Sequence, residues 1–518
     1  MAADRTARRY DVVVVGGGPA GSVTAWALAR RGLRVAVLER ARFPREKVCG
    51  DFVEPRGLKL LEAMGCLRAV EATSPLPITH VAIFVQSRCA YRGRIPFYGA
   101  TAGLLPHGYI VPRDELDAVL LEHARQAGAS VFEETAATGF SRERRQVTVV
   151  ARRRGQNEKV RGFLVVGADG THSIVAHDAG LFRADARYTA VSQRAYADGV
   201  ALERGEAAFF FDRDLFPGYG WMFPIAGGRA NVGVGILAET RNRCAVSVPG
   251  LFQSFLRKLR AAHPGCARLR LSSRPLGGIV RTYGGSGPNC FDGGLLVGDA
   301  GCFVDPITGE GIAPAAESAL IASAVVADAV DKGRSDGRFL SRYERDFRAY
   351  FDPALGYLDL CAAVMRNRFM RDFWLDAFGR GCEMAAADPD FARTAGSGFG
   401  GMDVRPLSIL SHIWKKLIED LGTSAAATFA SDFAGQARGR QAAAARWLRA
   451  IGSWTEGWWR SALDDPAWHA EWAADVFRKW MGVLERAGVQ SDPRARGPLG
   501  DRFAESARAA PPLDPPLL

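Results

Sequence analysis

The groups best suited to chemistry in this sequence are a thiol, a carboxyl group and two aromatic rings in two short segments. Cys49 and Asp51 lie in KVCGD, and Tyr219 and Trp221 lie in YGWMFP. The thiol or the carboxyl group could assist protonation, and the rings could wall a site for an apolar substrate. Each also has a structural interpretation: an inert buried cysteine, a carboxyl group that caps its loop, and rings that belong to the core.

Residues 10–40 predict the element that would position a nucleotide near these groups. Asp11–Val15 is a β-branched run typical of a buried parallel strand, and a glycine turn, GGGPAG, follows it. Residues 22–31 have helical composition, and residues 34–39 predict a second strand that ends in an acid. Strand, glycine turn, helix, strand and acid within about thirty residues are typical of a dinucleotide-binding unit.

Each glycine of the turn has a physical reason. Gly16 permits the tight turn, Gly18 lets the backbone approach a pyrophosphate, and Gly21 lets the helix lie close to the strand. The free N–H groups and the dipole of the helix favour phosphate there. Glu39 would bind ribose hydroxyls and argues against a 2′-phosphate, so FAD or NAD fits better than NADP. The motif alone does not separate FAD from NAD.

The length, composition and net charge of the chain limit the classes of protein to which it can belong. The chain has 518 residues, enough for two or three domains, and 48% of them are hydrophobic. The net charge of +11 indicates solubility, or a mild preference for anionic cofactors or membrane surfaces. No nucleic-acid-binding signature is present, so nucleic acid is not an expected partner. The nine scattered cysteines form no CxxC pair, so neither a disulfide framework nor a metal site is expected.

The beginning of the chain predicts its compartment. The first ten residues run into the first strand without an apolar signal region, and no run of about 18 apolar residues occurs elsewhere. We therefore expect a reducing, cytoplasmic setting.

The order of patterns along the chain predicts its organisation. Short alternating runs in 76–111 and 187–285 predict strands of a different sheet, with loops between them, that interrupts the nucleotide-binding unit. The α/β pattern resumes at 293–330 with a strand, a glycine loop and a long apolar helix. From about residue 336 the pattern is helical, and residues 491–518 are expected to be disordered.

The helical part contains an unusual series of tryptophans. Two sets recur at helical spacing: Trp447, Ile451, Trp454 and Trp458, then Trp468, Trp472, Val476 and Trp480. Three interpretations stay open: an amphipathic helix packed on the core, a lid over an apolar substrate, or a peripheral membrane contact.

Three separated motifs together resemble a known family. They are GGGPAG with Glu39, VVGADG at 165–170, and LLVGDAGCFVDPITGEGI at 295–312. The set resembles the FAD-dependent oxidoreductases built like para-hydroxybenzoate hydroxylase, which include aromatic hydroxylases, flavin halogenases and geranylgeranyl reductases. The resemblance spans roughly residues 8–335 and favours FAD over NAD.

The resemblance implies an α/β fold: a Rossmann-type FAD-binding domain, an inserted β-sheet substrate domain and a C-terminal helical extension. The expected FAD-binding domain comprises residues 8–75, 111–186 and 286–335, and the expected substrate domain comprises 76–110 and 187–285. A helical domain at 336–490 and the tail at 491–518 complete the chain.

The resemblance also assigns residues to the cofactor. Asp299 would contact the ribityl chain, Gly298 would allow the close turn, and Gly309–Ile312 would lie against the flavin pyrimidine. Arg113 matches the arginine that opens the family's FAD-contacting helix. The family arginine after the DG motif is replaced here by Ala176. The full expected FAD site is Gly16, Gly18, Pro19, Ala20, Gly21, Glu39, Arg40, Lys47, Cys49, Gly50, Arg113, Asp169, Gly298, Asp299, Gly309, Gly311 and Ile312.

Two further segments narrow the resemblance. KVCGD followed by PR is similar to geranylgeranyl and menaquinone side-chain reductases, and so is YGWMFP followed by NVGVG. Halogenases carry WxWxIP in place of the second motif, so Tyr219 and Phe223 count against chlorination. No GES follows Lys47 either.

The resemblance implies an FAD-dependent reductase that acts on carbon–carbon double bonds of a hydrophobic, isoprenoid-like substrate. NAD(P)H is the expected transient electron donor, since no second nucleotide-binding unit is predicted. The alternatives are a monooxygenase or halogenase-like tailoring enzyme of small-molecule biosynthesis, which the long extension favours, and a flavin-bearing protein without turnover. The oligomeric state stays open.

Overall fold

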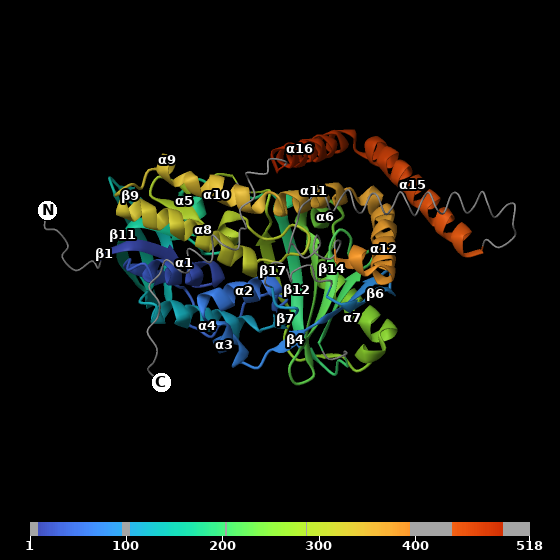
Figure 1. Cartoon of the computed structure of the whole chain (residues 1–518), viewed down its shortest axis with the longest axis horizontal. Coiled ribbons are helices and arrows are strands. Elements are labelled where there is room, and N and C mark those ends of the chain that lie inside the picture. Colours follow the sequence, from blue (N-terminus) through green and yellow to red (C-terminus); the bar gives the residue numbers. More distant parts are fainter. Residues whose placement is uncertain (1–8, 96–103, 202–204, 286, 394–437, 491–518) are drawn as a thin grey trace.

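The computed structural model describes residues 9–95, 104–201, 205–285, 287–393 and 438–490. Two eight-stranded sheets and a small third sheet form its body, and helices cover them (Figure 1). The tail expected to be disordered, 491–518, lies outside the described residues.

The first sheet is built around two parallel strands that the sequence identifies, β1 and β11. Its order is β18 (Cys290–Phe291), β19 (Gly294–Leu296), β11 (Gln156–Gly167), β1 (Arg9–Val15), β2 (Val35–Leu38) and β8 (Ser130–Phe132), with β10 (Gln146–Arg153) and β9 (Thr135–Glu143) continuing from β11. The β1, β2, β8, β11 and β19 pairings are parallel, so their carboxyl ends meet at one edge, where ligands bind in such sheets.

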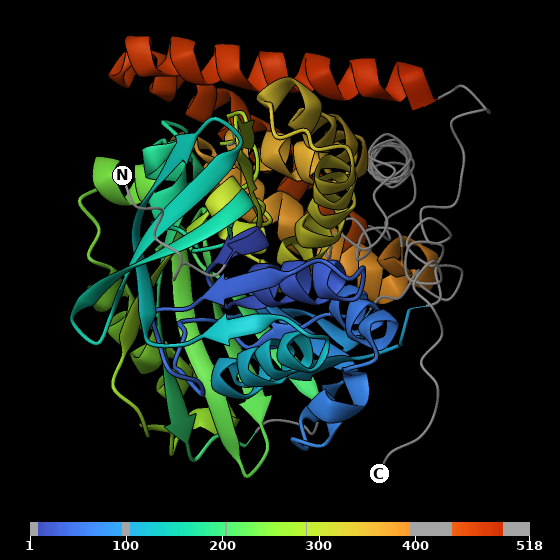
Figure 2. The same cartoon turned by 90° about the vertical axis from the view of Figure 1, so that its left-hand side faces the viewer.

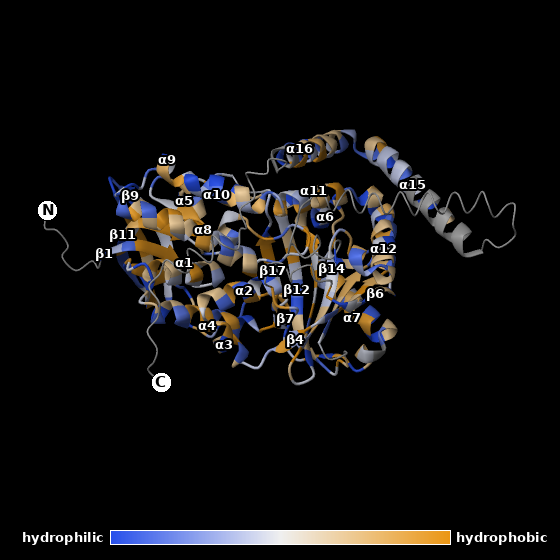
Figure 3. Ribbon diagram, viewed as in Figure 1, coloured by the Kyte–Doolittle hydropathy of each residue, from blue (hydrophilic) through white to orange (hydrophobic). Residues whose placement is uncertain are grey.

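Strand β1 is buried on both faces, which explains its continuous run of valines. Val12 and Val14 face one hydrophobic core, whereas Val13 and Val15 face another. Helices α1 (Pro19–Ala29), α4 (Arg113–Gln126) and α8 (Ile312–Asp331) contribute to the first of these cores, and α1 packs against both α4 and α8. Figure 3 shows the hydrophobic residues concentrated in these interior strands and helices.

Helix α8 resembles a membrane span by composition. It is the one described helix long and apolar enough to cross a membrane, and it is the long apolar helix that the pattern of 293–330 predicts. However, 72% of its apolar window is buried inside the protein, which is typical of a core helix.

The second sheet stands beside the first. Its order is β16 (Arg270–Leu271), β12 (Thr189–Asp198), β15 (Arg229–Leu237), β14 (Tyr219–Ile225), β13 (Glu206–Phe211), β5 (His80–Val85) and β6 (Arg88–Arg94), and β17 (Leu276–Arg281) also pairs with β12. The third sheet contains β3 (Phe52–Val53), β7 (Gly108–Ile110) and β4 (Leu76–Ile78). The prediction that the strands of 76–111 share one sheet is therefore wrong. Strands β5 and β6 belong to the second sheet, whereas β4 pairs with β7, and β7 pairs with β3, the strand that follows the KVCGD segment.

A helix occupies part of the segment expected to contain only strands and loops. Helix α7 (Val248–Ala262) packs on β15 and β12, and the short helix α6 (Ala238–Arg243) precedes it. Phe252, Phe255 and Leu259 of α7 are buried at helical spacing, and the Ser247 hydroxyl accepts a hydrogen bond from the N–H of Gly250. The helical spacing of these apolar residues and the Ser247 cap therefore together indicate α7 in the sequence.

The remaining helices cover the two sheets and extend to the end of the described chain. They are α2 (Pro55–Met64), α3 (Leu67–Glu71), α5 (Ile174–Asp178), α9 (Gly337–Leu340), α10 (Arg342–Phe351), α11 (Leu355–Met365), α12 (Arg371–Ala387), α15 (Arg438–Asp464) and α16 (Pro466–Gln490). Helix α16 packs on α11 and α15 packs on α12. Figures 1 and 2 show α15 and α16, in red, along the top of the molecule.

Candidate active site

A cavity of about 1350 Å³ runs between the two large sheets and reaches the C-terminal helices. The glycine turn after β1 lines one end, and α12, α15 and α16 line the other. The middle is walled by the KVCGD segment and by strands β13 and β14 of the second sheet. A nucleotide site and an apolar chamber are therefore parts of one continuous space.

Most residues predicted for the site line this cavity. Three do not, namely Gly21, Asp51 and Gly298, which lie behind the wall. Those on the wall are Gly16, Gly18, Pro19, Ala20, Glu39, Arg40, Lys47, Cys49, Gly50, Arg113, Asp169, Tyr219, Trp221, Asp299, Gly309, Gly311 and Ile312.

The glycine turn forms an open cradle. A Cβ on Gly21 would lie closer than 3.0 Å to the carbonyl oxygen of Gly16, so α1 reaches the turn only because residue 21 has no side chain. A Cβ on Gly18 would meet only Arg45 Nη2, at 3.5 Å. The neighbouring Nη1 of Arg45 is buried and has no hydrogen-bond partner. The guanidinium also pairs with Asp117, whose Oδ2 lies 2.9 Å from Nη2, so Nη1 is the part left to donate to a ligand. A cation with a free N–H beside the backbone N–H groups at a helix start fits the FAD pyrophosphate.

Glu39 ends β2 beside this cradle. Its Oε2 accepts a hydrogen bond from the N–H of Gly17 (2.7 Å), and its Oε1 accepts one from the N–H of Ala41 (2.8 Å). These bonds fix the carboxylate at the cavity wall, where the remaining lone pairs can accept ribose hydroxyls.

The two other carboxylates expected near FAD differ in their surroundings. Asp169 Oδ2 accepts a hydrogen bond from the N–H of Ile174 (2.7 Å), which caps α5, whereas its Oδ1 is buried without a partner. Asp299 lies on the wall with Oδ2 3.5 Å from the hydroxyl of Thr171. Gly298 has φ +59° and lies behind the wall, where its N–H donates to the Ser318 hydroxyl.

The KVCGD segment is held from behind by Asp51. Asp51 is fully buried at φ +65°, and its Oδ2 accepts hydrogen bonds from the Tyr196 hydroxyl and the Asn231 amide, both at 2.8 Å. The same amide nitrogen donates to the carbonyl oxygen of Cys49 (2.8 Å), and the indole of Trp221 donates to Asn231 Oδ1 (2.9 Å). Burial raises the pKa of Asp51 to about 6. Through these contacts Asp51 positions the KVCGD segment at the cavity wall.

Cys49 itself faces the cavity. Burial raises the pKa of its thiol, and the neighbouring Arg113 guanidinium opposes that shift. Arg113 is held at the start of α4 by two hydrogen bonds to Asp117, both 2.8 Å long. Cys49 is therefore a protonated thiol at neutral pH, beside a fixed cation.

The structure adds carboxyl groups on the cavity wall that the sequence motifs do not single out, among them Glu54, Asp305 and Glu310. Burial raises the pKa of Glu54 well above its usual value, and the charges of Glu310 and Asp305 add to the shift. Burial also raises the pKa of Glu310 to about 7 and that of Asp305. Glu310 and Asp305 accept backbone hydrogen bonds, from Ala313 and from Ile307, whereas no described residue donates a hydrogen bond to the Glu54 carboxyl group.

Tyr219 stands beside these carboxyl groups. Burial raises the pKa of its phenol, and Asp305, Glu54 and Cys49 reinforce the shift, which places all four groups around one part of the cavity. The phenol hydroxyl donates a hydrogen bond to the carbonyl oxygen of Thr308. A sequence signal for the acids existed, since Glu54 directly precedes the PR pair and Glu310 lies within GEGI, but both resemble ordinary helix starts.

The C-terminal helices close the far end of the cavity. The described side chains of α15 and α16 on its wall are Trp454, Trp458, Trp472, Val476 and Trp480. All five belong to the tryptophan series of the sequence, whereas the side chains of Trp447 and Ile451 lie outside the described residues.

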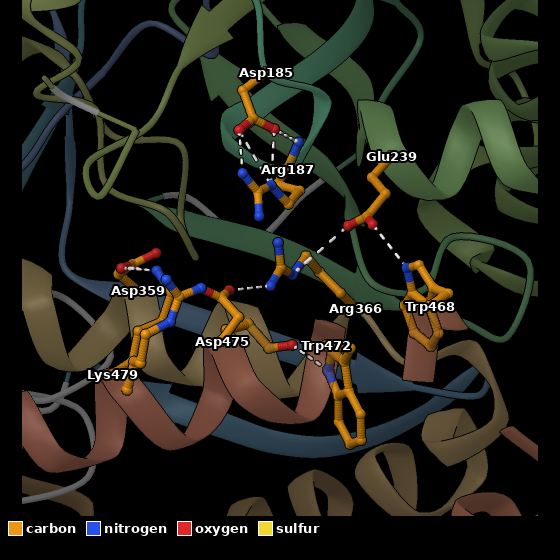
Figure 4. Close-up of polar contacts among 11 residues, drawn as sticks. Asp185, Arg187, Glu239, Asp359, Arg366, Trp468, Trp472, Asp475 and Lys479 are labelled. Carbon is orange, nitrogen blue, oxygen red and sulfur yellow. Dashed lines mark hydrogen bonds and ion pairs between the residues drawn. The ribbon is translucent and has the colours of Figure 1, made fainter. Parts of the chain in front are cut away.

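Buried polar contacts fasten α16 to the body (Figure 4). Lys479 pairs with Asp359 of α11, and Arg366 pairs with Asp475. Glu239 of α6 lies 3.6 Å from Arg366 Nε and accepts a 3.0 Å hydrogen bond from the Trp468 indole. The Trp472 indole donates to the carbonyl oxygen of Ala363 (2.8 Å). These contacts make α16 a fixed wall of the chamber.

The Arg366→Met substitution is expected to lower the free energy of unfolding by about 3 kcal/mol, because it leaves Asp475 and Glu239 buried without their shared cation. Arg478 stays near Asp475 on the solvent side and limits the loss. Urea denaturation measures the effect. The control is Arg478→Met, whose side chain is 72% exposed and whose loss should cost less than about 1 kcal/mol. Equal losses in both variants would contradict the role of the buried pair.

Comparison with known proteins agrees with this geometry. Residues 9–199 match the family described as "FAD binding domain". The chain is 36% identical over 356 residues to digeranylgeranylglycerophospholipid reductase 2 of Methanothermobacter thermautotrophicus, covering 66% of this chain and 83% of that protein. It is 31% identical over 324 residues to menaquinone reductase of Mycolicibacterium smegmatis, covering 59% and 73% of the two chains.

Solved structures share the fold. A geranylgeranyl bacteriochlorophyll reductase-like protein from Thermoplasma acidophilum superposes with a TM-score of 0.63 at 22% identity, covering 80% of this chain and 99% of that one. A flavin-dependent halogenase gives a TM-score of 0.60 at 22% identity, covering 80% and 78%. At these identities the likeness shows the fold alone.

The parallel sheet, the open glycine cradle and the matched domain define an FAD-dependent oxidoreductase. The predicted cofactor, FAD, and the predicted fold class are confirmed. Within that class, the chain belongs to the geranylgeranyl reductase family.

Proposed function

We propose that this enzyme reduces carbon–carbon double bonds of a hydrophobic, isoprenoid-like chain. The observation that carries the proposal is the continuity of the FAD cradle with an apolar chamber. Its side chains include Val81, Ile83, Phe209, Phe211, Phe223, Val364, Met365 and Phe378. Relatives named for digeranylgeranylglycerophospholipid and menaquinone reduction support the same substrate class.

The chain's own residues would hold FAD at one end of the cavity. In this proposal residues 8–75, 111–186 and 286–335 bind FAD, with the Gly16–Gly18 backbone and Arg45 at the pyrophosphate and Glu39 at the ribose. The segment 309–312 and the start of α8 would favour negative charge on the ring. When bound, FAD supplies the hydride, and Tyr219 and Trp221 wall the space where the alkene would lie and exclude water.

Reduction of an alkene also needs a proton for the second carbon. Glu54 is the proposed donor, because it lies on the cavity wall and no hydrogen bond to its carboxyl group is found among the described residues. Its pKa is raised well above its usual value by burial, which favours the protonated form that a donor needs. Glu310 supports this state through like-charge repulsion. Cys49, with its neutral thiol, would shape the pocket beside Arg113.

The electron donor and the setting complete the proposal. NAD(P)H would bind transiently. The sequence predicts one strand followed by a glycine turn of the GxGxxG type, and FAD occupies that unit in this proposal. A cytoplasmic enzyme in peripheral contact with a membrane fits a substrate that partitions into lipid.

Anaerobic mixing of the reduced holoenzyme with a geranylgeranylated phospholipid in detergent tests the proposal. The flavin absorbance should return at the rate at which saturated product forms. If the reduced flavin is stable toward the lipid and is reoxidised only by oxygen, the reductase proposal fails and the monooxygenase alternative gains support.

A further inference from the structure

Helices α15 and α16 carry a second apolar stripe that faces away from the chamber. Among the described residues, seven of the eight most exposed large hydrophobic side chains lie on these two helices, and Ile279 is the eighth. Two of the seven, Trp454 and Trp480, line the cavity. The other five form what we call the outer stripe: Trp459 (65% exposed), Leu463 (80%), Phe477 (64%), Met481 (39%) and Leu484 (40%).

The outer stripe follows helical spacing. Trp459 and Leu463 are four residues apart on α15, and Phe477, Met481 and Leu484 recur at i, i+4 and i+7 on α16. None of the five lines the cavity, so they present a face different from that of Trp458, Trp472 and Val476. Both helices are thus apolar on two faces, and within the described part of the chain the inner face packs on the body whereas the outer stripe stays exposed.

We infer that the outer stripe is the surface by which the enzyme docks on a lipid bilayer, with α15 and α16 separating the bilayer from the substrate chamber. This inference rests on the proposed function, because it names the source of the hydrophobic substrate. A chain that leaves the bilayer at this face would meet the chamber directly beneath it, past Trp454 and Trp480.

Charge and composition favour a bilayer over a second copy of the chain. The net charge of +11 attracts anionic lipid and opposes association between copies. Tryptophan and phenylalanine are typical of the apolar face of interfacial helices. Arg460 and Arg478 flank Trp459 and Phe477 with side chains that are 68% and 72% exposed, and each pairs with a carboxylate of its own helix.

The buried contacts of α16 support docking as a rigid surface. Lys479 and Asp475 fasten the inner side of the helix to α11 and Arg366, so the outer stripe is held in place without lipid. A preformed apolar surface avoids the ordering cost of a segment that must fold on binding. Docking therefore needs no change of fold.

Flotation of the full-length holoenzyme with vesicles of phosphatidylcholine and phosphatidylglycerol tests the inference. The wild-type protein should float with the vesicles. The triple variant Trp459→Ser, Leu463→Ser, Phe477→Ser should bind at least about tenfold more weakly, since burying one such side chain alone contributes about tenfold or more. The control, Ile279→Ser, removes an exposed hydrophobic side chain (41%) that lies on β17, outside the stripe, and should float like the wild type.

Three outcomes would overturn the inference. The wild type could stay at the bottom of the gradient, or the triple variant could float as well as the wild type, or Ile279→Ser could lose binding equally. Sedimentation velocity tests whether a second copy of the chain covers the outer stripe instead. If the wild type is a dimer that does not float, and the triple variant is a monomer, the stripe is a dimer interface.

The proposed function is measured in a separate experiment, as reoxidation of the reduced flavin by substrate in detergent. The triple variant should keep this reaction and lose turnover of substrate presented in vesicles. Loss of the detergent reaction in the wild type would reject the proposed function while leaving the flotation result valid. Unchanged far-UV circular dichroism shows that the exposed substitutions leave the fold intact.

Discussion

A Gly21→Ala protein should purify without flavin. The new methyl group would lie closer than 3.0 Å to the carbonyl oxygen of Gly16, which is backbone and cannot rotate away. Helix α1 must then move off the turn, and the N–H groups at its start leave the position that suits the pyrophosphate. Flavin absorbance after gel filtration measures the loss, and circular dichroism establishes that the chain still folds.

The matched control for this substitution is Gly452→Ala on α15. Nothing lies within 4 Å of the Cβ that alanine would add there, so the variant should keep its flavin and gain up to about 1 kcal/mol of helix stability. A folded Gly21→Ala protein with a full complement of FAD would contradict the placement of the cofactor.

Replacing Glu54 with glutamine is expected to lower turnover by about 100-fold or more at every pH while FAD stays bound, because the amide cannot give up a proton. A proton donor works in its protonated form, so wild-type activity should be high below the pKa of the Glu54–Glu310 pair and fall as the pH rises through it. The matched control is Glu62→Gln, an exposed carboxyl group on α2, the helix that begins directly after Glu54, and this variant should behave like the wild type.

Glu310→Gln separates this proton-donor role from a structural one. It removes a charge that raises the pKa of Glu54, so the falling limb of the pH profile should move to lower pH while the low-pH rate persists. The folded chain raises the pKa of Glu310 from 4.5 to about 7, so wild-type stability from this group is lost as the pH rises through that window. The variant should lack that loss in urea titrations. An unmoved limb would assign the pH dependence to another group.

The cofactor end of the site could be predicted from local sequence because its geometry is local. Gly16, Gly18 and Gly21 each answer a backbone requirement within one strand–turn–helix unit, and they lie at the turn as expected. The assignment of each predicted residue to FAD stays a prediction for the glycine and Glu54 variants to test.

The rest depended on contacts between distant segments. The pKa of Glu54 depends on Glu310 and Asp305, some 250 residues away, so its sequence neighbours give no sign of its state. Asp51 appeared to be a candidate for chemistry, yet Tyr196 and Asn231 hold it behind the wall. Helix α7 was missed because its cap and its short apolar periodicity lie among strand patterns.

The tryptophan series shows the same limit. Its helical spacing was evident, but the spacing alone could not separate a packed helix, a lid and a membrane contact. The structure places Trp458 and Trp472 on the chamber wall and leaves Trp459 exposed, because neighbouring positions on a helix face different directions.

The most direct test of the central claim is the mass of the product formed from a geranylgeranylated phospholipid by the reduced enzyme, once without oxygen and once in air. A reductase should give a product heavier by two hydrogen atoms for each reduced double bond, formed without oxygen. A product heavier by one oxygen atom, and formed only in air, would contradict it and make the enzyme a monooxygenase.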